Sequence, residues 1–273
     1  MIEAKVNLVT GALNSMKRYV INLDRSEERL THIKSVFTKE GLDFTRVKAV
    51  DGRNLSQEDY ERLTQTSIWP KPLTKAEVAC FLSHRECWRL IAEGDDPYGA
   101  VFEDDVKLSP HAYLFLTKFD WIPEGCDIVK LDTAEITCVL GKFNKELLDG
   151  YKLAPLITKH YCSGGYIISK SCAKRLYDEN KQITAPVDEI MYNPECGIFP
   201  TLNIEQMFPA VVVQIGLSST ILYERKTIKG PKHSRRTIPE KIRRELKRFK
   251  KRYLVPWALK TFRGCFWGIV PFR

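Results

Sequence analysis

Ala100-Val101-Phe102-Glu103-Asp104-Asp105-Val106 is an apolar run that ends in three adjacent carboxylates and then becomes apolar again. Neighbouring acids repel one another, so a buried strand that ends in three of them is typical of a place where a cation binds. Open α/β sheets bind their ligands at the carboxyl ends of the strands. The stretch therefore predicts a divalent-metal site at the edge of a sheet. The alternative is a solvated acidic turn.

The segment upstream predicts a parallel strand–helix–strand unit. The β-branched and aromatic run Tyr19–Leu23 is typical of a buried strand, and apolar residues at helical spacing follow from Ser26 to Gly41. A second strand is expected from Phe44 to Val50, closed by Asp51-Gly52. A strand, a helix and a strand in so short a segment favour parallel pairing. Neither a dinucleotide fingerprint nor a P-loop occurs here.

The rest of the body also alternates between helical and strand patterns. Thr74-x-x-Glu77 predicts a capping box, with a helix running to about Glu93. Residues 54–73 and 135–160 show no clear regular pattern, although the second range has a hairpin-like character. Further expected elements are strands over Asp127–Asp132, Gly164–Ser169 and Phe208–Ile215, a helix from Ser171 to Tyr177 and a helix opened by Pro186. These patterns together predict an α/β fold.

Charge divides the chain into an acidic body and a basic end. Residues 225–273 contain 17 Lys and Arg against 2 Asp and Glu, whereas residues 1–224 contain 26 against 32. The overall charge of +9 therefore describes the end of the chain and not the site. Eight cysteines are scattered without a Cys-x-x-Cys pair, which favours reduced core residues in a cytosolic protein over disulfides.

The basic end has the pattern of an amphipathic helix. From Pro239, apolar residues recur every three or four positions as far as Trp257, with Lys and Arg between them. Aromatic and aliphatic residues continue to Phe272. This combination favours attachment to an anionic membrane surface through residues 239–273. A nucleic-acid arm and a surface helix packed on its own domain are the alternatives; the apolar stripe makes nucleic acid the weaker of them.

No signal peptide is recognised at the start of the chain, and no apolar stretch approaches the length of about 18 residues that spans a membrane. The expected organisation is an N-terminal extension over residues 1–15, a catalytic domain over residues 16–224 and the basic amphipathic segment over residues 225–273.

Five motifs occur in an order that resembles one family. They are Tyr19-Val-Ile-Asn-Leu-Asp-Arg-x-x-x-Arg29, Lys48-Ala-Val-Asp-Gly52, Glu77-x-x-Cys80-x-x-Ser83-His84, Glu103-Asp-Asp-Val106 and Pro186-Val-Asp188. Each motif alone is weak, but the set resembles glycosyltransferase family 25. That family contains lipooligosaccharide glycosyltransferases of Gram-negative bacteria and collagen galactosyltransferases. The resemblance covers roughly residues 17–215.

The resemblance implies a GT-A-like fold, a single Rossmann-type mixed sheet flanked by helices. It implies a sugar-nucleotide donor, commonly UDP-galactose, inversion at the anomeric carbon, and an outer-core sugar of lipooligosaccharide or lipopolysaccharide as acceptor. UDP-glucose and UDP-N-acetylhexosamine remain alternative donors. With the basic end, it implies a protein in the cytoplasm, peripheral on the inner face of the bacterial inner membrane.

The residue chemistry agrees with metal-assisted transfer. A diphosphate leaves more easily when Mn²⁺ or Mg²⁺ neutralises its developing charge, and hard carboxylate oxygens hold such a cation. Asp105 is the expected direct ligand, with Glu103 as the other metal residue of an acidic-x-acidic pattern. Glu103 or Asp104 would otherwise contact the donor. His233 is a weaker candidate for a late ligand.

The other donor-binding candidates come from the loops and the helix around the triplet. They are Asn22, Arg25 and Arg29 after the first strand, Asp51 after the second, and Ser83 and His84 on the helix before the triplet. The competing interpretations are a solvated helix face for the two arginines and a satisfied core residue for His84.

Inverting transfer needs a base for the acceptor hydroxyl. Asp188 is the expected base, and the adjacent Glu189 is the second catalytic candidate, although it would face elsewhere on a helix. An ordinary acid at a helix N-terminus is the competing interpretation. A non-catalytic basic membrane-binding protein and a metal-dependent hydrolase are the alternatives to a transferase.

Overall fold

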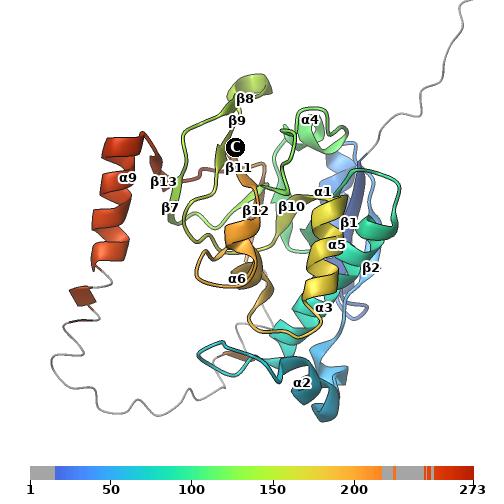
Figure 1. Cartoon of the computed structure of the whole chain (residues 1–273). Coiled ribbons are helices and arrows are strands. Elements are labelled where there is room, and N and C mark those ends of the chain that lie inside the picture. Colours follow the sequence, from blue (N-terminus) through green and yellow to red (C-terminus); the bar gives the residue numbers. More distant parts are fainter. Residues whose placement is uncertain (1–15, 217–223, 226–242, 244, 247–248) are drawn as a thin grey trace, which may run out of the picture.

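The computed structural model describes residues 16–216, 224–225, 243, 245–246 and 249–273. Its centre is an eight-stranded mixed sheet with the order β2-β1-β3-β10-β5-β11-β9-β8 (Figure 1). The strands are β2 (Thr45–Lys48), β1 (Lys17–Asn22), β3 (Tyr98–Glu103), β10 (Gly165–Ser169), β5 (Ile128–Lys130), β11 (Ile204–Phe208), β9 (Lys152–Pro155) and β8 (Lys145–Glu146). The expected α/β class with one mixed central sheet is therefore confirmed.

The first strand–helix–strand unit forms as expected. β1 pairs in parallel with β2 on one side and with β3 on the other, and α1 (Glu27–Lys39) connects β1 to β2. All of β1 after Lys17 is buried, because apolar residues on alternate sides face helices on both faces of the sheet. The carboxyl ends of β1, β2 and β3 consequently meet at one edge, and the acidic triplet begins where β3 ends.

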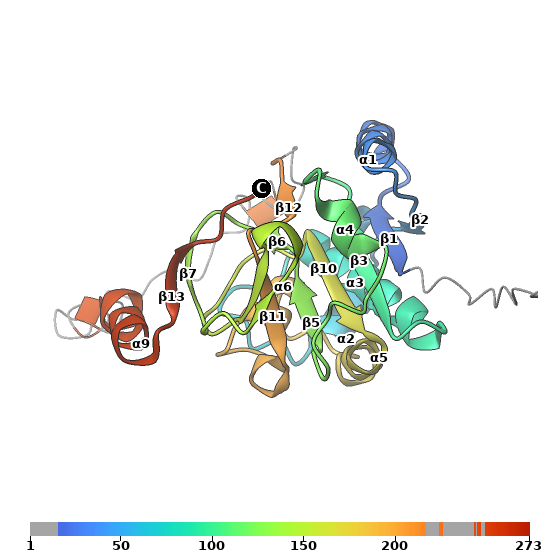
Figure 2. The same ribbon diagram turned by 90° about the horizontal axis from the view of Figure 1, so that it is seen from above.

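Helices cover the two faces of the sheet unequally (Figure 2). On one face, Tyr19 and Tyr166 pack with side chains from α3 (Lys75–Glu93), α5 (Lys170–Glu179) and α6 (Val187–Tyr192). On the other face, Val20 and Ile167 pack with α1 and α4 (Ala112–Leu116). The capping box of Thr74 and Glu77 at the start of α3 is present, as the spacing predicts.

Several elements differ from the sequence expectations. α2 (Gln57–Thr64), whose N-cap is Ser56, lies within the range expected to be irregular. Ser169 rather than Ser171 caps α5, because its hydroxyl is the one that accepts from Cys172 N. The single strand expected over Phe208–Ile215 is wrong: Pro209, which has no N–H for a ladder, separates β11 from β12 (Val212–Gln214).

Two smaller sheets complete the body. β12 lies between β4 (Val106–Leu108) and β6 (Asp132–Thr133). β13 (Phe266–Ile269) pairs with β7 (Thr137–Leu140), although it belongs to the segment expected to form a separate tail. Beyond β13, the carbonyl of Val270 accepts from Thr133 Oγ1 at 2.7 Å and the carbonyl of Arg273 accepts from Tyr151 Oη at 2.6 Å. The end of the chain therefore packs on the body.

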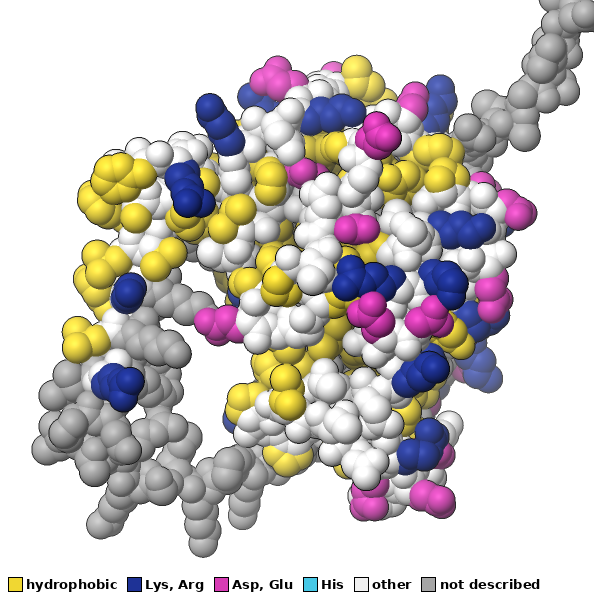
Figure 3. All heavy atoms as spheres, viewed as in Figure 1, with side chains coloured by type: hydrophobic (Ala, Val, Ile, Leu, Met, Phe, Trp, Pro, Cys, Tyr) yellow, Lys and Arg dark blue, Asp and Glu magenta, His cyan; other side chains and the backbone are white. Residues whose placement is uncertain are grey.

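The described part of the basic segment before β13 stands beside the body. It contains a π-helical turn over Lys250–Leu254 and α9 (Val255–Arg263). Phe249, Tyr253 and Trp257 are all exposed, and apolar side chains gather on this segment in Figure 3. Ile242 and the expected start of the helix at Pro239 lie outside the described residues. Among the helices in the described part of the chain, none is long and apolar enough to cross a bilayer.

Candidate functional site: two cavities at the carboxyl edge of the sheet

A cavity of about 550 Å³ opens at the carboxyl ends of β1 and β3 and along the N-terminal half of α3. It lies where open α/β sheets place their ligands, and its volume is that of a typical small-molecule site. Seven of the predicted donor-binding residues line it: Arg25, Arg29, Asp51, Ser83, His84, Glu103 and Asp104. The sequence therefore predicted that these seven side chains gather at one edge, and their role in donor binding stays a prediction. Asn22 and Asp105 are not among its lining residues.

Glu103 is an acid of the triplet whose carboxylate lies on the cavity side and contacts Ser163, Gln214 and His84. Its Oε1 accepts from Ser163 Oγ at 2.8 Å and lies 3.4 Å from His84 Nε2. Its Oε2 accepts from the side-chain amide of Gln214 at 3.1 Å. Burial raises the pKa of Glu103, but His84 and Ser163 lower it by more, so the pKa lies below its ordinary value. The residue is consequently poised as a carboxylate at the cavity wall.

Asp104 and Asp105 share a cation that the protein itself provides. Arg29 Nη2 lies 2.6 Å from Asp104 Oδ1 and 2.8 Å from Asp105 Oδ2. Asn22 Nδ2 also donates to Asp104, at 2.6 Å. Asn22 and Arg29 were expected to contact the donor, but in the structure both side chains contact acids of the triplet. Arg29 therefore supplies part of the positive charge that stabilises three adjacent carboxylates.

Burial also sets the protonation of these two acids. It raises the pKa of Asp104, although Arg29 and Asn22 oppose the change. Burial and the neighbouring charge of Glu103 raise the pKa of Asp105 to about 6, again opposed by Arg29. The triplet is therefore a set of acids with different proton affinities, of which Glu103 is ionised most readily.

Glu103 and Asp105 direct carboxylate oxygens toward one shared hydrogen-bond donor. Gln214 Nε2 donates to Glu103 Oε2 and to Asp105 Oδ1, each at 3.1 Å. One donor group satisfies both carboxylates, so their lone pairs converge on a common region. Oxygen ligands converging in this way are the kind that Mn²⁺ and Mg²⁺ prefer. Asp105 is paired with the cationic Arg29, whereas Glu103 contacts Ser163, Gln214 and His84 and lines the cavity, so Glu103 is the more accessible of the two ligand candidates.

Arg25 and Asp51 form the outer rim of the cavity. Asp51 Oδ2 lies 2.8 Å from Arg25 Nε and 2.7 Å from Arg53 Nη2. The hydrogen bond from Arg53 holds the pKa of Asp51 well below its ordinary value, with Arg25 adding to the effect. Ionised Asp51 therefore connects the loop after β2 to the loop after β1. The sequence predicts that these two loops lie at the same edge of the sheet.

Ser83 and His84 line the cavity, and hydrogen bonds to buried groups fix both side chains. Ser83 Oγ donates to Ala79 O at 2.7 Å and accepts from Val50 N at 2.9 Å, which joins α3 to the end of the second strand. His84 is fully buried, and its Nδ1 lies 3.0 Å from Tyr166 Oη. Ser83 is therefore engaged structurally, whereas His84 directs Nε2 toward Glu103.

Asp188 and Glu189 lie in a second cavity of about 300 Å³, which Trp69, Tyr161 and Arg225 also line. Glu189 is paired with Lys159 and accepts from Asn193 Nδ2 at 2.8 Å. The carboxylate of Asp188 accepts a longer hydrogen bond, from Cys162 N at 3.4 Å. Burial and the charge of Glu189 raise the pKa of Asp188. Of the two predicted catalytic acids, Glu189 is engaged in an ion pair, and the role of Asp188 as a base stays a prediction.

The loop over residues 162–164 joins the two cavities. Cys162 N contacts Asp188, and the next residue, Ser163, donates to Glu103. Gly164 N donates to Asp132 at 3.0 Å, and Asp132 forms a buried ion pair with Lys130. Burial raises the pKa of Asp132 to about 6. Asp188 and Glu103 are consequently held by adjacent residues.

Sequence reasoning missed Ser163, Gln214, Lys130 and Asp132. A charged Lys130-x-Asp132 pattern at the end of an apolar strand is a signal for the buried pair. No local pattern marks Ser163 or Gln214, because their partners are 60 and 111 positions away. His233 lies outside the described residues.

Comparison with known proteins identifies the family of the chain. A family model described as glycosyltransferase family 25 (LPS biosynthesis protein) matches residues 15–191. The chain is 28% identical over 242 residues to the lacto-N-neotetraose biosynthesis glycosyltransferase LgtB of Neisseria meningitidis serogroup B, covering 82% of this chain and 88% of that protein.

Two further relatives extend the comparison. The lipooligosaccharide biosynthesis protein lic2B of Haemophilus influenzae is 27% identical over 267 residues, covering 88% of this chain and 98% of that protein. Procollagen galactosyltransferase 1-A of Xenopus laevis is 28% identical over 187 residues, covering 63% of this chain and 30% of that protein. The family resemblance inferred from the five motifs is thereby confirmed.

Proposed function

Because the chain belongs to glycosyltransferase family 25, we propose that it transfers galactose from UDP-galactose to an outer-core sugar of lipooligosaccharide or lipopolysaccharide. The observation that carries the proposal is the pair of adjacent cavities joined by residues 162–163. One cavity gathers the acids and Arg25 at the sheet edge, and the other contains Asp188. Two reactants held side by side are what a group transfer requires.

In this proposal the larger cavity binds the donor. Arg25 and Asp51, on the loops after β1 and β2, form hydrogen bonds with the nucleoside end, while Glu103 faces the diphosphate end. A GT-A-like arrangement of the sheet fits this assignment. A divalent cation held by Glu103, with Asp105 next to it, would neutralise the negative charge that develops on the diphosphate. Arg29 holds Asp104 and Asp105 in place, because it forms an ion pair with each of them.

The smaller cavity binds the acceptor sugar. Trp69 and Tyr161 provide aromatic groups at its wall, which suit the apolar faces of a sugar ring. Asp188 takes the proton of the acceptor hydroxyl while that oxygen attacks the anomeric carbon of the donor. The bond from this carbon to the diphosphate breaks on the opposite side, so UDP leaves and the configuration inverts. The raised pKa of Asp188 makes it a stronger base than an exposed aspartate.

The basic segment around α9 supports attachment to an anionic membrane surface, where a lipid-linked acceptor resides. Exposed Phe249, Tyr253 and Trp257 provide groups that insert among headgroups, and the Lys and Arg of residues 225–273 provide the attraction. The corresponding location is the cytoplasmic face of the bacterial inner membrane. This part of the proposal is independent of the choice of donor.

A donor screen tests the proposed reaction. The protein is incubated with UDP-galactose, UDP-glucose or UDP-N-acetylhexosamines, a short outer-core oligosaccharide and Mn²⁺, and the release of UDP is measured with and without EDTA. We expect turnover with UDP-galactose that needs the acceptor and that EDTA removes. Turnover that persists in EDTA contradicts metal assistance, and equal release of UDP without acceptor favours a hydrolase. A preference for another UDP-sugar contradicts galactose, because a pocket distinguishes sugars by the position of single hydroxyls.

A further inference from the structure

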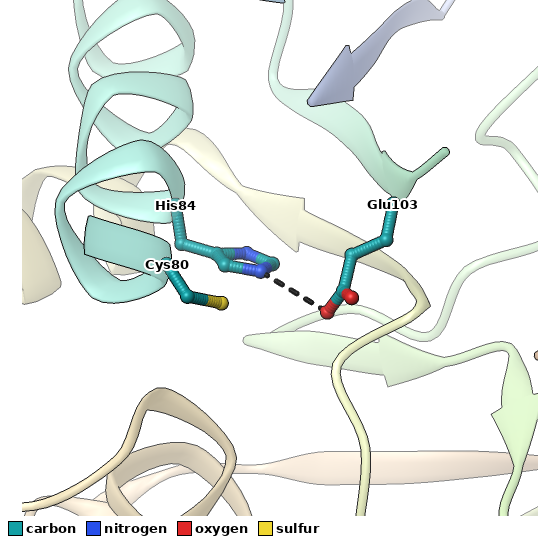
Figure 4. Close-up of side chains that lie close together, drawn as sticks. All are labelled: Cys80, His84 and Glu103. Carbon is teal, nitrogen blue, oxygen red and sulfur yellow. Dashed lines mark ion pairs between the residues drawn. The ribbon is translucent and has the colours of Figure 1, made fainter. Parts of the chain in front are cut away.

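Cys80, His84 and Glu103 form a cluster on the wall of the larger cavity. The ligand atoms of the three side chains all lie within 4.8 Å of one another, and Figure 4 shows the side chains of α3 directed toward the end of β3. All three residues line the cavity, so the cluster has an open side. The transfer proposed above uses Glu103 but leaves Cys80 without a role.

The helix and the sheet fix this arrangement. Cys80 and His84 are four positions apart on α3, which places them on the same face of the helix. Tyr166 on β10 orients the imidazole: its hydroxyl lies 3.0 Å from His84 Nδ1 and accepts from Trp88 Nε1 at 2.9 Å. His84 therefore presents Nε2 to the cluster. A hydroxyl that fixes the far nitrogen of a histidine is the kind of outer contact that orients metal ligands.

The thiol does not have the properties of a nucleophile. Burial raises the pKa of Cys80 well above its ordinary value, and the charge of Glu103 adds to the effect. A cation bound to sulfur reverses this preference, because the thiol then loses its proton to solvent and coordinates as thiolate. Thiolate, imidazole and carboxylate groups together therefore favour a bound cation over a nucleophilic role for the thiol.

The donor set and its spacing identify the ion. A thiolate with an imidazole favours Zn²⁺ over Mn²⁺ or Mg²⁺, which prefer oxygen alone. Ligand bonds of about 2.0–2.1 Å in a tetrahedral zinc site place neighbouring nitrogen and oxygen atoms roughly 3.3 Å apart. His84 Nε2 and Glu103 Oε1 are separated by 3.4 Å. Three protein ligands and one open position are also the pattern of accessible zinc sites.

We propose that Cys80, His84 and Glu103 bind one Zn²⁺ ion, with its fourth position facing the donor cavity. This site differs from the oxygen site between Glu103 and Asp105 in its thiolate and imidazole ligands. The two sites share Glu103, so Zn²⁺ excludes the harder cation from that carboxylate. Zinc therefore inhibits sugar transfer by occupying the wall on which the donor diphosphate rests.

Metal binding is measured on the full chain after chelator treatment, without donor or acceptor. Co²⁺ serves as the probe, because a cobalt–thiolate bond gives a charge-transfer absorption and tetrahedral cobalt gives strong visible bands. We expect both signals in the wild type and their displacement by one equivalent of Zn²⁺. Cys80→Ser is expected to lose the thiolate signal and to weaken zinc binding by more than the roughly 10–100-fold typical of an outer contact.

Two variants serve as comparisons. Cys162→Ser removes the other partly exposed thiol and is expected to retain the cobalt spectrum. Tyr166→Phe removes the hydroxyl that orients His84 and is expected to weaken zinc binding by roughly 10-fold with the thiolate signal retained. Absence of the thiolate signal in the wild type, or its persistence in Cys80→Ser, overturns the proposal.

A second measurement does not depend on the folding of a variant. Wild-type protein is loaded with one equivalent of Zn²⁺, and the ligands of the ion are identified by X-ray absorption spectroscopy at the zinc edge. We expect one sulfur ligand together with nitrogen and oxygen ligands. A shell of nitrogen and oxygen without sulfur contradicts the site. These binding results stand whether or not the protein transfers galactose, so a failed donor screen and a failed zinc site are distinguishable.

Discussion

Asn22 donates a hydrogen bond of 2.6 Å to Asp104 through its side-chain amide, across 82 positions of the chain. Both residues were candidates for contact with the donor, but in the structure each satisfies the other. The amide also donates to Ser26 O at 3.2 Å, and its oxygen accepts from Arg46 Nε at 2.9 Å. The end of β1 is thereby joined to the acidic turn after β3, so this bond contributes to the position of the triplet.

Replacing Asn22 by Leu removes the donor to Asp104 while keeping the size of the side chain. Leaving a buried acid without a hydrogen-bond donor costs about 1–3 kcal/mol, so the free energy of unfolding is expected to fall by that amount. Urea denaturation followed by circular dichroism measures the change. Arg46→Met is the matched control: it removes the exposed partner of the same side chain and is expected to cost less than about 1 kcal/mol. Equal losses in the two variants contradict the importance of the buried bond.

Arg29→Met is expected to make the stability of the protein depend on divalent cations. Removing one partner of a largely buried ion pair costs about 3 kcal/mol, because Asp104 and Asp105 lose their shared cation. Mn²⁺ can then take over this charge, so it should raise the Tm of the variant by more than that of the wild type. Thermal unfolding over a series of Mn²⁺ concentrations tests this. The exposed pair of Arg62 and Asp59 provides the control Arg62→Met, in which Mn²⁺ should have no added effect.

Asp188→Asn is expected to remove the proposed base without removing donor binding. Loss of a general base lowers the rate of transfer by roughly 10²–10⁴-fold, while the affinity for UDP-galactose in the other cavity stays near that of the wild type. Steady-state kinetics and calorimetry separate the two quantities. Asp178→Asn on the exposed face of α5 is the control and should keep the wild-type rate. A variant at position 188 that retains most of the rate contradicts the assignment.

The acidic limb of the pH–rate profile should follow the protonation of Asp188. The base must be ionised, so kcat/KM falls as the pH drops through its pKa. Burial and the negative charge of Glu189 raise that pKa, whereas the positive charge of Lys159 lowers it. Glu189→Gln is therefore expected to shift the limb to lower pH, and Lys159→Met to shift it to higher pH. Shifts in the same direction, or none, contradict the role of Asp188.

The exposed aromatic residues of the basic segment should govern attachment to membranes. Replacing Phe249, Tyr253 and Trp257 by Ser is expected to weaken binding to vesicles that contain anionic phosphatidylglycerol, because their insertion is lost. Sedimentation with vesicles at two salt concentrations measures this, and turnover of a soluble acceptor should be unchanged. Replacing exposed Tyr113 by Ser on α4 is the control. Unchanged binding of the triple variant contradicts the anchor.

The sequence by itself determined the first strand–helix–strand unit, the start of α3 and much of the membership of the larger cavity. A continuous apolar run such as Tyr19–Leu23 is stable as a central strand buried on both faces, and the capping box at Thr74 and Glu77 places the start of α3. Because parallel strands bring their carboxyl ends to one edge, Asp51 and Glu103 were expected in one cavity, and both line it. Local patterns of this kind depend only on neighbouring residues.

Only the tertiary structure decided which partner each site residue has. It places Arg29 between Asp104 and Asp105, Gln214 against Glu103, and Asp188 in a second cavity. It also brings Cys80 and His84 to Glu103 and returns the chain end to pair with β7. These contacts join strands and helices that are distant in the chain. Their identity depends on the order of strands in the sheet and on side-chain packing, which no local periodicity encodes.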